Sequence, residues 1–214
     1  RNKSAQKYKN YLNKVEQSER EDLKRFEQIV LECENQLHDE YSKLLEVKQI
    51  PEDAKLISYG MDFGYSNDPT TLVSVYSKDY NLYIKEHLYR TQMTTQDINV
   101  FLREQNLLRN PIYADSAEPR LIAELRRMGH NIFPSIKGKD SINAGIDLLK
   151  RYKLHITSDS NNAIQEFRNY KWKIDKSGKL INIPEDKHNH CIDPCRYATY
   201  SLLSRPNFGK YAIQ

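Results

Sequence analysis

Hydrophobic and polar positions divide the chain into a helical first part and a second part in which strands and helices alternate. Residues 1–48 contain no glycine or proline, and their apolar side chains recur every three or four residues from Tyr8 to Leu44. That spacing predicts one long amphipathic helix or a helical hairpin. Charged residues interrupt the apolar stripe over residues 16–22, so we expect a break or loop there. A solvated helix packed on its own domain or on a sister chain, and a helix that binds a partner or DNA, both fit this segment.

After Pro51 the pattern changes to short apolar runs. The first three runs are separated by polar turns and predict an antiparallel meander, at residues 57–64, 70–77 and 81–90. Beyond them, helical spacing is found at residues 95–108, 118–129, 140–152 and 161–169, and further strand-like runs at residues 111–115, 131–135 and 154–157. Residues 170–183 alternate around Lys176-Ser177-Gly178, which predicts a β-hairpin. The order of elements predicts an α/β fold with a mixed sheet flanked by helices.

Carboxylates lie at the ends of two predicted strands and near the start of the last predicted helix. Asp62 belongs to the apolar run 56–63, Asp115 ends the run that follows Asn110, and Asp193 precedes the last helical stretch. A buried carboxylate costs several kcal/mol unless a metal ion or a base compensates its charge. Three such groups can converge on one point of an α/β sheet, where their hard oxygen atoms suit Mg²⁺ or Mn²⁺. For Asp62 alone, a turn aspartate that caps the next loop is the simpler reading.

Composition and charge narrow the class of protein. Net charge is +4, and because residues 1–48 carry ten basic and ten acidic side chains, the whole excess belongs to residues 49–214. A basic surface of this kind favours a polyanionic partner. No apolar run approaches the roughly 20 residues of a membrane span, and we expect neither a membrane segment nor a signal peptide. Three cysteines, an odd number, do not indicate a disulfide framework and suggest a reducing compartment.

Five phrases carry a resemblance to a known family when they are taken together and in order. They are YGMDFGYSNDP (59–69), YADSAEP (113–119), KGKDSI (137–142), NYKW (169–172) and HNHCIDPCRYA (188–198). They resemble the C-terminal nuclease domain of the large terminase subunit of tailed bacteriophages, which has an RNase H-like fold. The resemblance implies an RNase H-like nuclease domain over residues 49–214, with an extra β-hairpin, after a helical segment over residues 1–48 whose role is open. No Gly-x-x-x-x-Gly-Lys-Ser/Thr motif occurs, so we expect the ATP-driven motor of a terminase to be absent.

The resemblance also implies an activity and a set of functional residues. The expected activity is a Mg²⁺- or Mn²⁺-dependent endonuclease that cuts double-stranded DNA with little sequence specificity, as in cleavage of concatemeric phage genomes during packaging. Asp62 would bridge two ions, while Asp115 and Asp193 would complete one site each. His190 would assist the second ion or the attacking water, and Lys137 would steady the phosphate. A structural histidine and a solvent-facing lysine are the corresponding alternatives.

Basic side chains and partners follow from the same resemblance. Candidate contacts to the DNA backbone are Lys137, Lys139, Lys171, Lys173, Lys176 and Lys179. The four lysines of the hairpin fit equally well as charges that protect an exposed sheet edge. Expected partners are double-stranded DNA, a terminase ATPase domain, the small terminase subunit and the portal, with no membrane. The expected location is the cytoplasm of the infected or lysogenic bacterial host.

Two other interpretations compete with the nuclease. His188, His190, Cys191 and Cys195 form a cluster with the ligand types of a zinc site, but they crowd into eight residues and leave Asp62 unexplained. A non-catalytic assembly module is the other, in which the fold docks DNA or a portal and the N-terminal helices drive oligomerisation. Retention of all three acids favours the enzyme. Asp186 lies in a polar loop and is expected to face solvent.

Overall fold

The computed structural model describes residues 44–138 and 140–204, together with residues 15, 17, 18, 20–22, 24 and 25. All described residues before Leu44 are helical, and the predicted break over residues 16–22 is therefore wrong where it can be compared. No glycine or proline weakens the helix there, and the Gln17 Nε2 atom donates to the Glu21 carboxylate one turn later, at 3.4 Å. The remainder of the predicted N-terminal helical segment lies outside the described residues.

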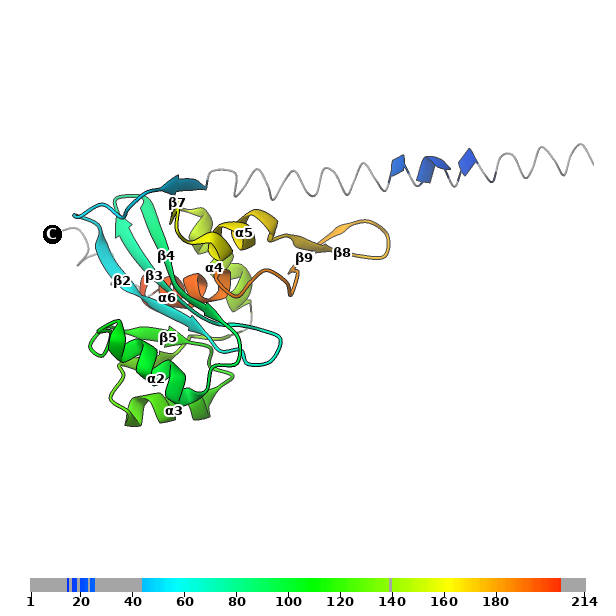
Figure 1. Cartoon of the computed structure of the whole chain (residues 1–214). Coiled ribbons are helices and arrows are strands. Elements are labelled where there is room, and N and C mark those ends of the chain that lie inside the picture. Colours follow the sequence, from blue (N-terminus) through cyan, green and yellow to red (C-terminus); the bar gives the residue numbers. More distant parts are fainter. Residues whose placement is uncertain are drawn as a thin grey trace, which may run out of the picture.

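A seven-stranded mixed sheet forms the centre of the fold, in the order β1-β7-β4-β3-β2-β5-β6 (Figure 1). The strands are β1 Leu45–Val47, β2 Lys55–Asp62, β3 Thr70–Lys78, β4 Asn81–Arg90, β5 Ile112–Ala114, β6 Ile132–Pro134 and β7 Lys153–Thr157. β2, β3 and β4 pair antiparallel, as the predicted meander requires. The pairs β2·β5, β5·β6, β4·β7 and β1·β7 are parallel. This is the mixed sheet that the sequence predicted.

The first strand corrects the predicted boundary at residue 48. β1 pairs in parallel with β7, from Leu45 opposite His155 to Val47 opposite Thr157. Glu46 between them binds Arg168 through an ion pair of 2.5 Å. The helical prediction extended too far because the partner of β1 lies more than a hundred residues later in the chain, where no local pattern can reveal it. The sheet therefore begins at Leu45.

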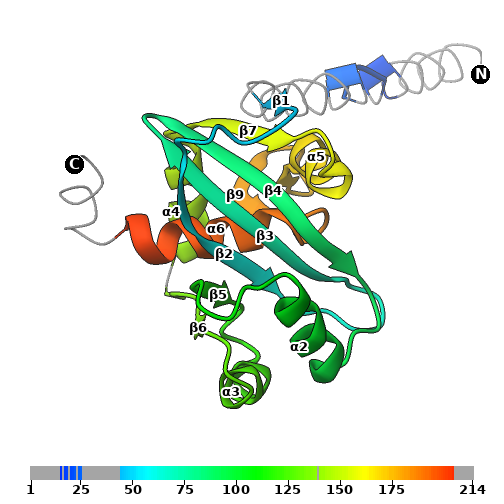
Figure 2. The same ribbon diagram turned by 60° about the vertical axis from the view of Figure 1, so that its left-hand side comes forward.

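Helices cover both faces of the sheet. They are α2 Thr95–Glu104, α3 Pro119–Arg127, α4 Ser141–Lys150, α5 Asn161–Asn169 and α6 Ile192–Leu203. One apolar cluster packs α4, α5 and α6 on the sheet, around Ile84, Leu149 and Phe167. A second cluster, around Met61 and Leu125, packs α2 and α3 on the other face. Figure 2 shows α6 crossing behind β2 and β3 while α2 lies in front of them.

The predicted hairpin is present and projects beyond α5 (Figure 1). Its strands are β8 Trp172–Ile174 and β9 Leu180–Pro184, which pair antiparallel. The Asp175 carboxylate accepts hydrogen bonds from the backbone N–H groups of Ser177, at 2.8 Å, and Lys179, at 2.9 Å. Gly178 takes a φ of 80°, which explains why glycine stands at this turn. Searched over the described residues, the helices include none with the length and apolar character of a membrane span.

Candidate active site

β2 presents different side chains to its two faces, and Asp62 lies on the face that meets α6. Strand residues alternate between faces, so Ser58, Gly60 and Asp62 share one side. Ser58 Oγ donates to the Ala198 carbonyl of α6 at 3.2 Å. A Cβ atom on Gly60 would lie 1.9 Å from the carbonyl oxygen of Pro194, so only glycine allows α6 to approach this closely. The first turn of α6 therefore rests on the end of β2 that carries Asp62.

The other two predicted acids reach the same edge of the sheet. Ala114 of β5 pairs with Met61, and the backbone N–H of Asp115 donates to the Met61 carbonyl at 3.2 Å. Asp115 thus follows one strand where Asp62 ends its parallel neighbour. Asp193 lies in the first turn of α6, with its backbone N–H bonded to Asn189 at 2.7 Å. We refer to Asp62, Asp115 and Asp193 as the acidic edge.

Electrostatic coupling indicates that the three carboxylates lie close together. Burial raises the pKa of Asp62 most, and the negative charges of Asp193 and Asp115 raise it further, against a hydrogen bond from His190 that lowers it. Burial likewise raises the pKa of Tyr197, and all three carboxylates add to that shift. A cation is therefore favoured at this edge, because it would relieve the repulsion among the acids.

His190 lies between two acids. Its Nδ1 atom is 3.4 Å from Asp62 Oδ2, and its Nε2 atom is 3.6 Å from the exposed Asp68. The pKa of His190 is raised, chiefly by the hydrogen bond with Asp62. The rings of His190 and Tyr89 meet in a T-shaped arrangement, with 6.5 Å between ring centroids. The structure thus brings His190 to the acidic edge, while its role there stays a prediction.

Basic side chains engage the other two acids. Lys137, half exposed, forms an ion pair with Asp115. Asp193 accepts from Arg196 Nη2 at 2.9 Å and from Arg196 Nε at 3.2 Å, and the hydroxyl of Tyr197 lies 3.4 Å from its second oxygen. Each carboxylate of the acidic edge therefore has a basic partner of its own.

An open pocket of about 490 Å³ adjoins the acidic edge, between α4, α6 and the hairpin. Its lining includes Asp115, Lys137, Asp193, Arg196, Tyr197 and, from β9, Ile183 and Pro184. Asp62 is not among the lining residues, although its side chain is as exposed as that of Asp193. Lys176 and Lys179 are exposed at the turn of the hairpin, whereas Lys171 and Lys173 are partly buried. Lys139, the remaining predicted DNA contact, lies outside the described residues.

Comparison with known proteins shows which RNase H-like family the chain resembles. The model of the terminase RNase H-like domain family matches residues 62–200. The chain belongs to this family. The large terminase subunit of Bacillus phage SPP1 is 35% identical over 148 residues, which cover 66% of this chain and 35% of that protein. The PBSX phage terminase large subunit of Bacillus subtilis strain 168 is 30% identical over 164 residues, covering 73% and 35%. The chain thus spans about a third of the length of these relatives.

Solved structures of terminases share the fold. The nuclease domain of the SPP1 large terminase, solved with bound Mn, superposes with a TM-score of 0.66 at 28% identity, covering 74% of this chain and 96% of that one. A large terminase from a thermophilic bacteriophage, solved with ATP-γ-S, gives 0.62 at 19% identity, covering 77% and 45%. The nuclease domain of the P22 large terminase gives 0.54 at 14%, covering 76% and 89%. At their low identities, the last two support the fold alone.

The side chains of the acidic edge suit a divalent ion in chemistry, although they do not yet surround one point. Among the described residues, no three acid, histidine or cysteine side chains are grouped closely enough to hold an ion as they stand. Asp115 and Asp193 instead turn to Lys137 and Arg196. The three carboxylates supply hard oxygen donors, and a cation among them would relieve the repulsion from Asp193 and Asp115 that raises the pKa of Asp62, which fits Mg²⁺ or Mn²⁺. As ligands of such an ion, the three acids stay a prediction.

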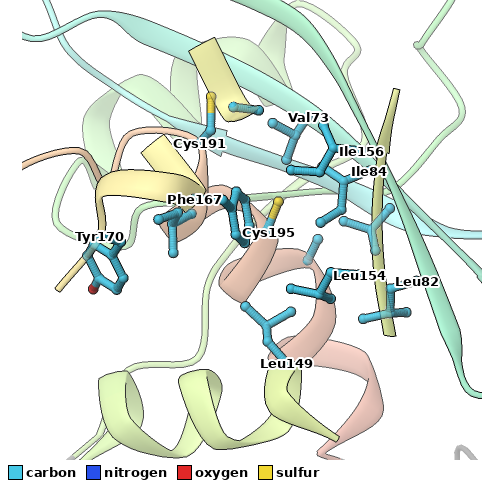
Figure 3. Packing of buried hydrophobic residues seen from close by; sticks show 14 of the residues in the cluster. Val73, Leu82, Ile84, Leu149, Leu154, Ile156, Phe167, Tyr170, Cys191 and Cys195 are labelled. Atoms are coloured by element: carbon cyan, nitrogen blue, oxygen red, sulfur yellow. The ribbon is translucent and has the colours of Figure 1, made fainter. Parts of the chain in front are cut away.

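The zinc interpretation is wrong. Cys191 and Cys195 are completely buried in the apolar cluster with Phe167, where Figure 3 shows both sulfur atoms among aliphatic side chains. Burial raises the pKa of both thiols well above its ordinary value, which disfavours the thiolate that binds metal. His188 is exposed, whereas His190 turns to Asp62. The two cysteines therefore pack in the hydrophobic core.

Several residues of the site escaped the sequence interpretation. The sequence analysis assigns Arg196 and Tyr197 no role of their own, yet they follow Asp193 by three and four residues. On a helix that spacing places them on the same face, so their contacts with Asp193 were predictable. Glu166 carried no such signal, since its partners Tyr89 and Cys191 come from distant parts of the chain. Asp186 is exposed, as predicted.

Proposed function

We propose that the chain is a metal-dependent endonuclease that hydrolyses phosphodiester bonds of double-stranded DNA with little sequence preference, and that it cuts concatemeric phage genomes during packaging. The observation that carries this proposal is the convergence of Asp62, Asp115 and Asp193 on one edge of an RNase H-like sheet, beside an open pocket. Membership of the terminase family supports it. So does the Mn bound to the SPP1 nuclease domain, the most similar of the structures described above.

The three acids would hold two divalent ions, which would act as Lewis acids that make water nucleophilic near neutral pH and offset the charge on the leaving 3′ oxygen. His190 contributes a ring whose Nδ1 atom lies 3.4 Å from Asp62 Oδ2. It is therefore placed to exchange a proton with the attacking water. Arg196 holds the Asp193 carboxylate in place through two hydrogen bonds. Lys137 contributes a positive charge at the pocket, where it would contact a phosphate once its ion pair with Asp115 is released.

The hairpin beside the pocket supplies a route for sequence-independent DNA binding. Lys176 and Lys179 are exposed at its turn, and Ile183 and Pro184 of β9 line the pocket itself. Lysine contacts to phosphate oxygens attract DNA of any sequence and weaken as salt rises. We assign Lys171 and Lys173 to the same surface, while Lys139, outside the described residues, stays a predicted DNA contact. Protection of an exposed sheet edge remains a compatible second role for these charges.

The proposal also includes the partners and the location of the nuclease. Terminase relatives of which this chain spans about a third are large subunits, and one of the solved large terminases holds ATP-γ-S. We infer that the nuclease works with a terminase ATPase domain, a small terminase subunit and a portal, in the cytoplasm of the infected or lysogenic host. The role of the N-terminal helical segment stays open.

Plasmid cleavage tests the proposal directly. Supercoiled plasmid is incubated with the chain in EDTA, Mg²⁺, Mn²⁺ or Zn²⁺, with Asp62→Asn as the test variant. Asp79→Asn is the matched control, because Asp79 is an exposed acid in the β3–β4 turn with a φ of 53° that asparagine also adopts. We expect nicking and linearisation in Mg²⁺ or Mn²⁺ by the wild type and the control. Asp62→Asn should lose on the order of 1,000-fold, about 4 kcal/mol of transition-state stabilisation.

Two outcomes would contradict the proposed nuclease activity. Equal cleavage by Asp62→Asn and the wild type would assign the activity to a contaminant. Absence of cleavage with every metal, combined with retained DNA binding, would favour the assembly module instead. Sedimentation of the chain with and without residues 1–43 would then show whether the N-terminal segment drives oligomerisation, as that alternative requires.

A further inference from the structure

A buried glutamate on α5 contacts the loop that leads into the acidic edge. Glu166 is 3% exposed, although glutamate is seldom buried without a partner. Its Oε2 atom accepts from the backbone N–H of Cys191 at 2.5 Å, and its Oε1 atom accepts from the hydroxyl of Tyr89 at 3.0 Å. Cys191 is the N-cap residue of α6 and provides no cap through its own side chain. The carboxylate of another helix therefore satisfies this N–H group.

The peptide bond between His190 and Cys191 is held on both of its sides. Its N–H group donates to Glu166, while its carbonyl oxygen accepts from Thr71 Oγ1 of β3 at 2.5 Å. Tyr89 of β4 adds a third contact, since its ring packs in a T-shaped arrangement with the ring of His190. The orientation of one peptide plane is thus fixed from α5, β3 and β4 together. His190 precedes that plane and Asp193 follows it by two residues.

We propose that Glu166 is a positioning residue of the nuclease: with Thr71 and Tyr89 it fixes the His190–Cys191 peptide and so sets the directions in which His190 and Asp193 enter the acidic edge. This inference rests on the proposed function, but the fixed peptide is a feature of the chain with or without catalysis. Rotation of the peptide plane would displace His190 from Asp62 and tilt the first turn of α6. Displacement of a reacting group by about 1 Å can cost roughly 100-fold in rate.

Two substitutions separate the hydrogen bond from the charge. Glu166→Gln keeps an oxygen that can accept from Cys191 N–H, and its NH₂ group can donate to Tyr89 if the tyrosine hydroxyl accepts. Glu166→Leu keeps the volume but leaves the Cys191 N–H unpaired. For plasmid cleavage we expect kcat of the leucine variant to fall about 100-fold with the KM for DNA within about twofold. The glutamine variant should keep at least a third of the wild-type kcat.

A matched control distinguishes positioning from loss of stability. Ile164→Ala removes a buried side chain from the same helix without touching the Cys191 contact. Its melting temperature should fall as much as that of Glu166→Leu, but kcat at a temperature below both transitions should stay within about threefold of wild type. Tyr89→Phe removes the hydroxyl and keeps the ring against His190. We expect an intermediate loss of several-fold in kcat.

Amide hydrogen exchange provides a readout that needs no activity. In Glu166→Leu the Cys191 amide should exchange at least about tenfold faster than in wild type, while the same amide in Ile164→Ala and Glu166→Gln stays protected. Unchanged exchange, or equal kcat losses in the leucine variant and the Ile164→Ala control, would overturn the positioning role. If the wild type cleaves no DNA but the exchange pattern holds, the proposed function fails and the fixed peptide stands. A glutamine variant as slow as the leucine variant would also refute the hydrogen-bond argument.

Discussion

The two faces of β2 carry different kinds of side chain and have different roles. On the side of α2 and α3, Tyr59 and Met61 are large, apolar and buried in the second cluster. On the side of α6, the same strand presents Ser58, Gly60 and Asp62, which are small or polar. The first face stabilises the sheet through volume, whereas the second gives up volume so that α6 can approach and bring Asp193 to the acidic edge. Stability and chemistry are thus divided between alternate residues.

Of the residues on the two faces of β2, Gly60 is expected to show the largest effect when it is substituted. In Gly60→Ala the new Cβ would lie 1.9 Å from the Pro194 carbonyl oxygen and would push α6 off β2. Because backbone atoms must move, we expect a loss of at least about 4 kcal/mol in the free energy of unfolding, together with loss of cleavage. Urea denaturation and the plasmid assay measure both effects. Gly138→Ala is the matched control, since no atom lies within 4 Å of a Cβ at Gly138, and it should be nearly neutral in stability.

Met61 tests the opposite face. Its side chain is fully buried, so Met61→Ala should lower the free energy of unfolding by about 2–5 kcal/mol. Cleavage per folded molecule should remain within about threefold of wild type, because the acids lie on the other side of the strand. A loss of tenfold or more in protein that is still folded would show that the two faces are not independent. Ile183→Ala, at a residue 53% exposed, should change stability by less than about 0.5 kcal/mol.

A smaller expected effect is a dependence of the free energy of unfolding on pH, which arises at His87 on the face of Tyr59. Burial lowers the pKa of His87 to about 4, and its ring hydrogen-bonds Ser74 beside Tyr59. Between pH 6.5 and 4, His87 takes up a proton in the unfolded chain but stays neutral in the folded chain. The free energy of unfolding therefore falls as the pH falls through this window. The loss is about 3 kcal/mol at most. His87→Gln should flatten the dependence of the urea unfolding free energy on pH over that range. An unchanged slope would rule out His87 as its source.

Local patterns revealed most of the fold and the identity of the acids. Alternation and turn chemistry were enough for β2, β3, β4 and the hairpin, because each pairs with a near neighbour in sequence. The role of β1 could not be found in this way, since its partner β7 follows more than a hundred residues later. Glu166 resembled an ordinary surface residue of a helix. Only the folded chain brings Tyr89 and Cys191 to it.

The positions of the three acids along the chain also determine when, during synthesis, the acidic edge can form. Asp62 ends the second strand of the sheet, while Asp193 follows it by 131 residues on the last described helix. At the usual rates of synthesis the ribosome needs roughly 7 to 26 seconds to make that stretch. A nascent chain can therefore pair β2, β3 and β4 early but has no complete set of carboxylates until α6 emerges and settles on Gly60. Until then the three carboxylates that we propose as metal ligands cannot come together, because Asp193 is synthesised last.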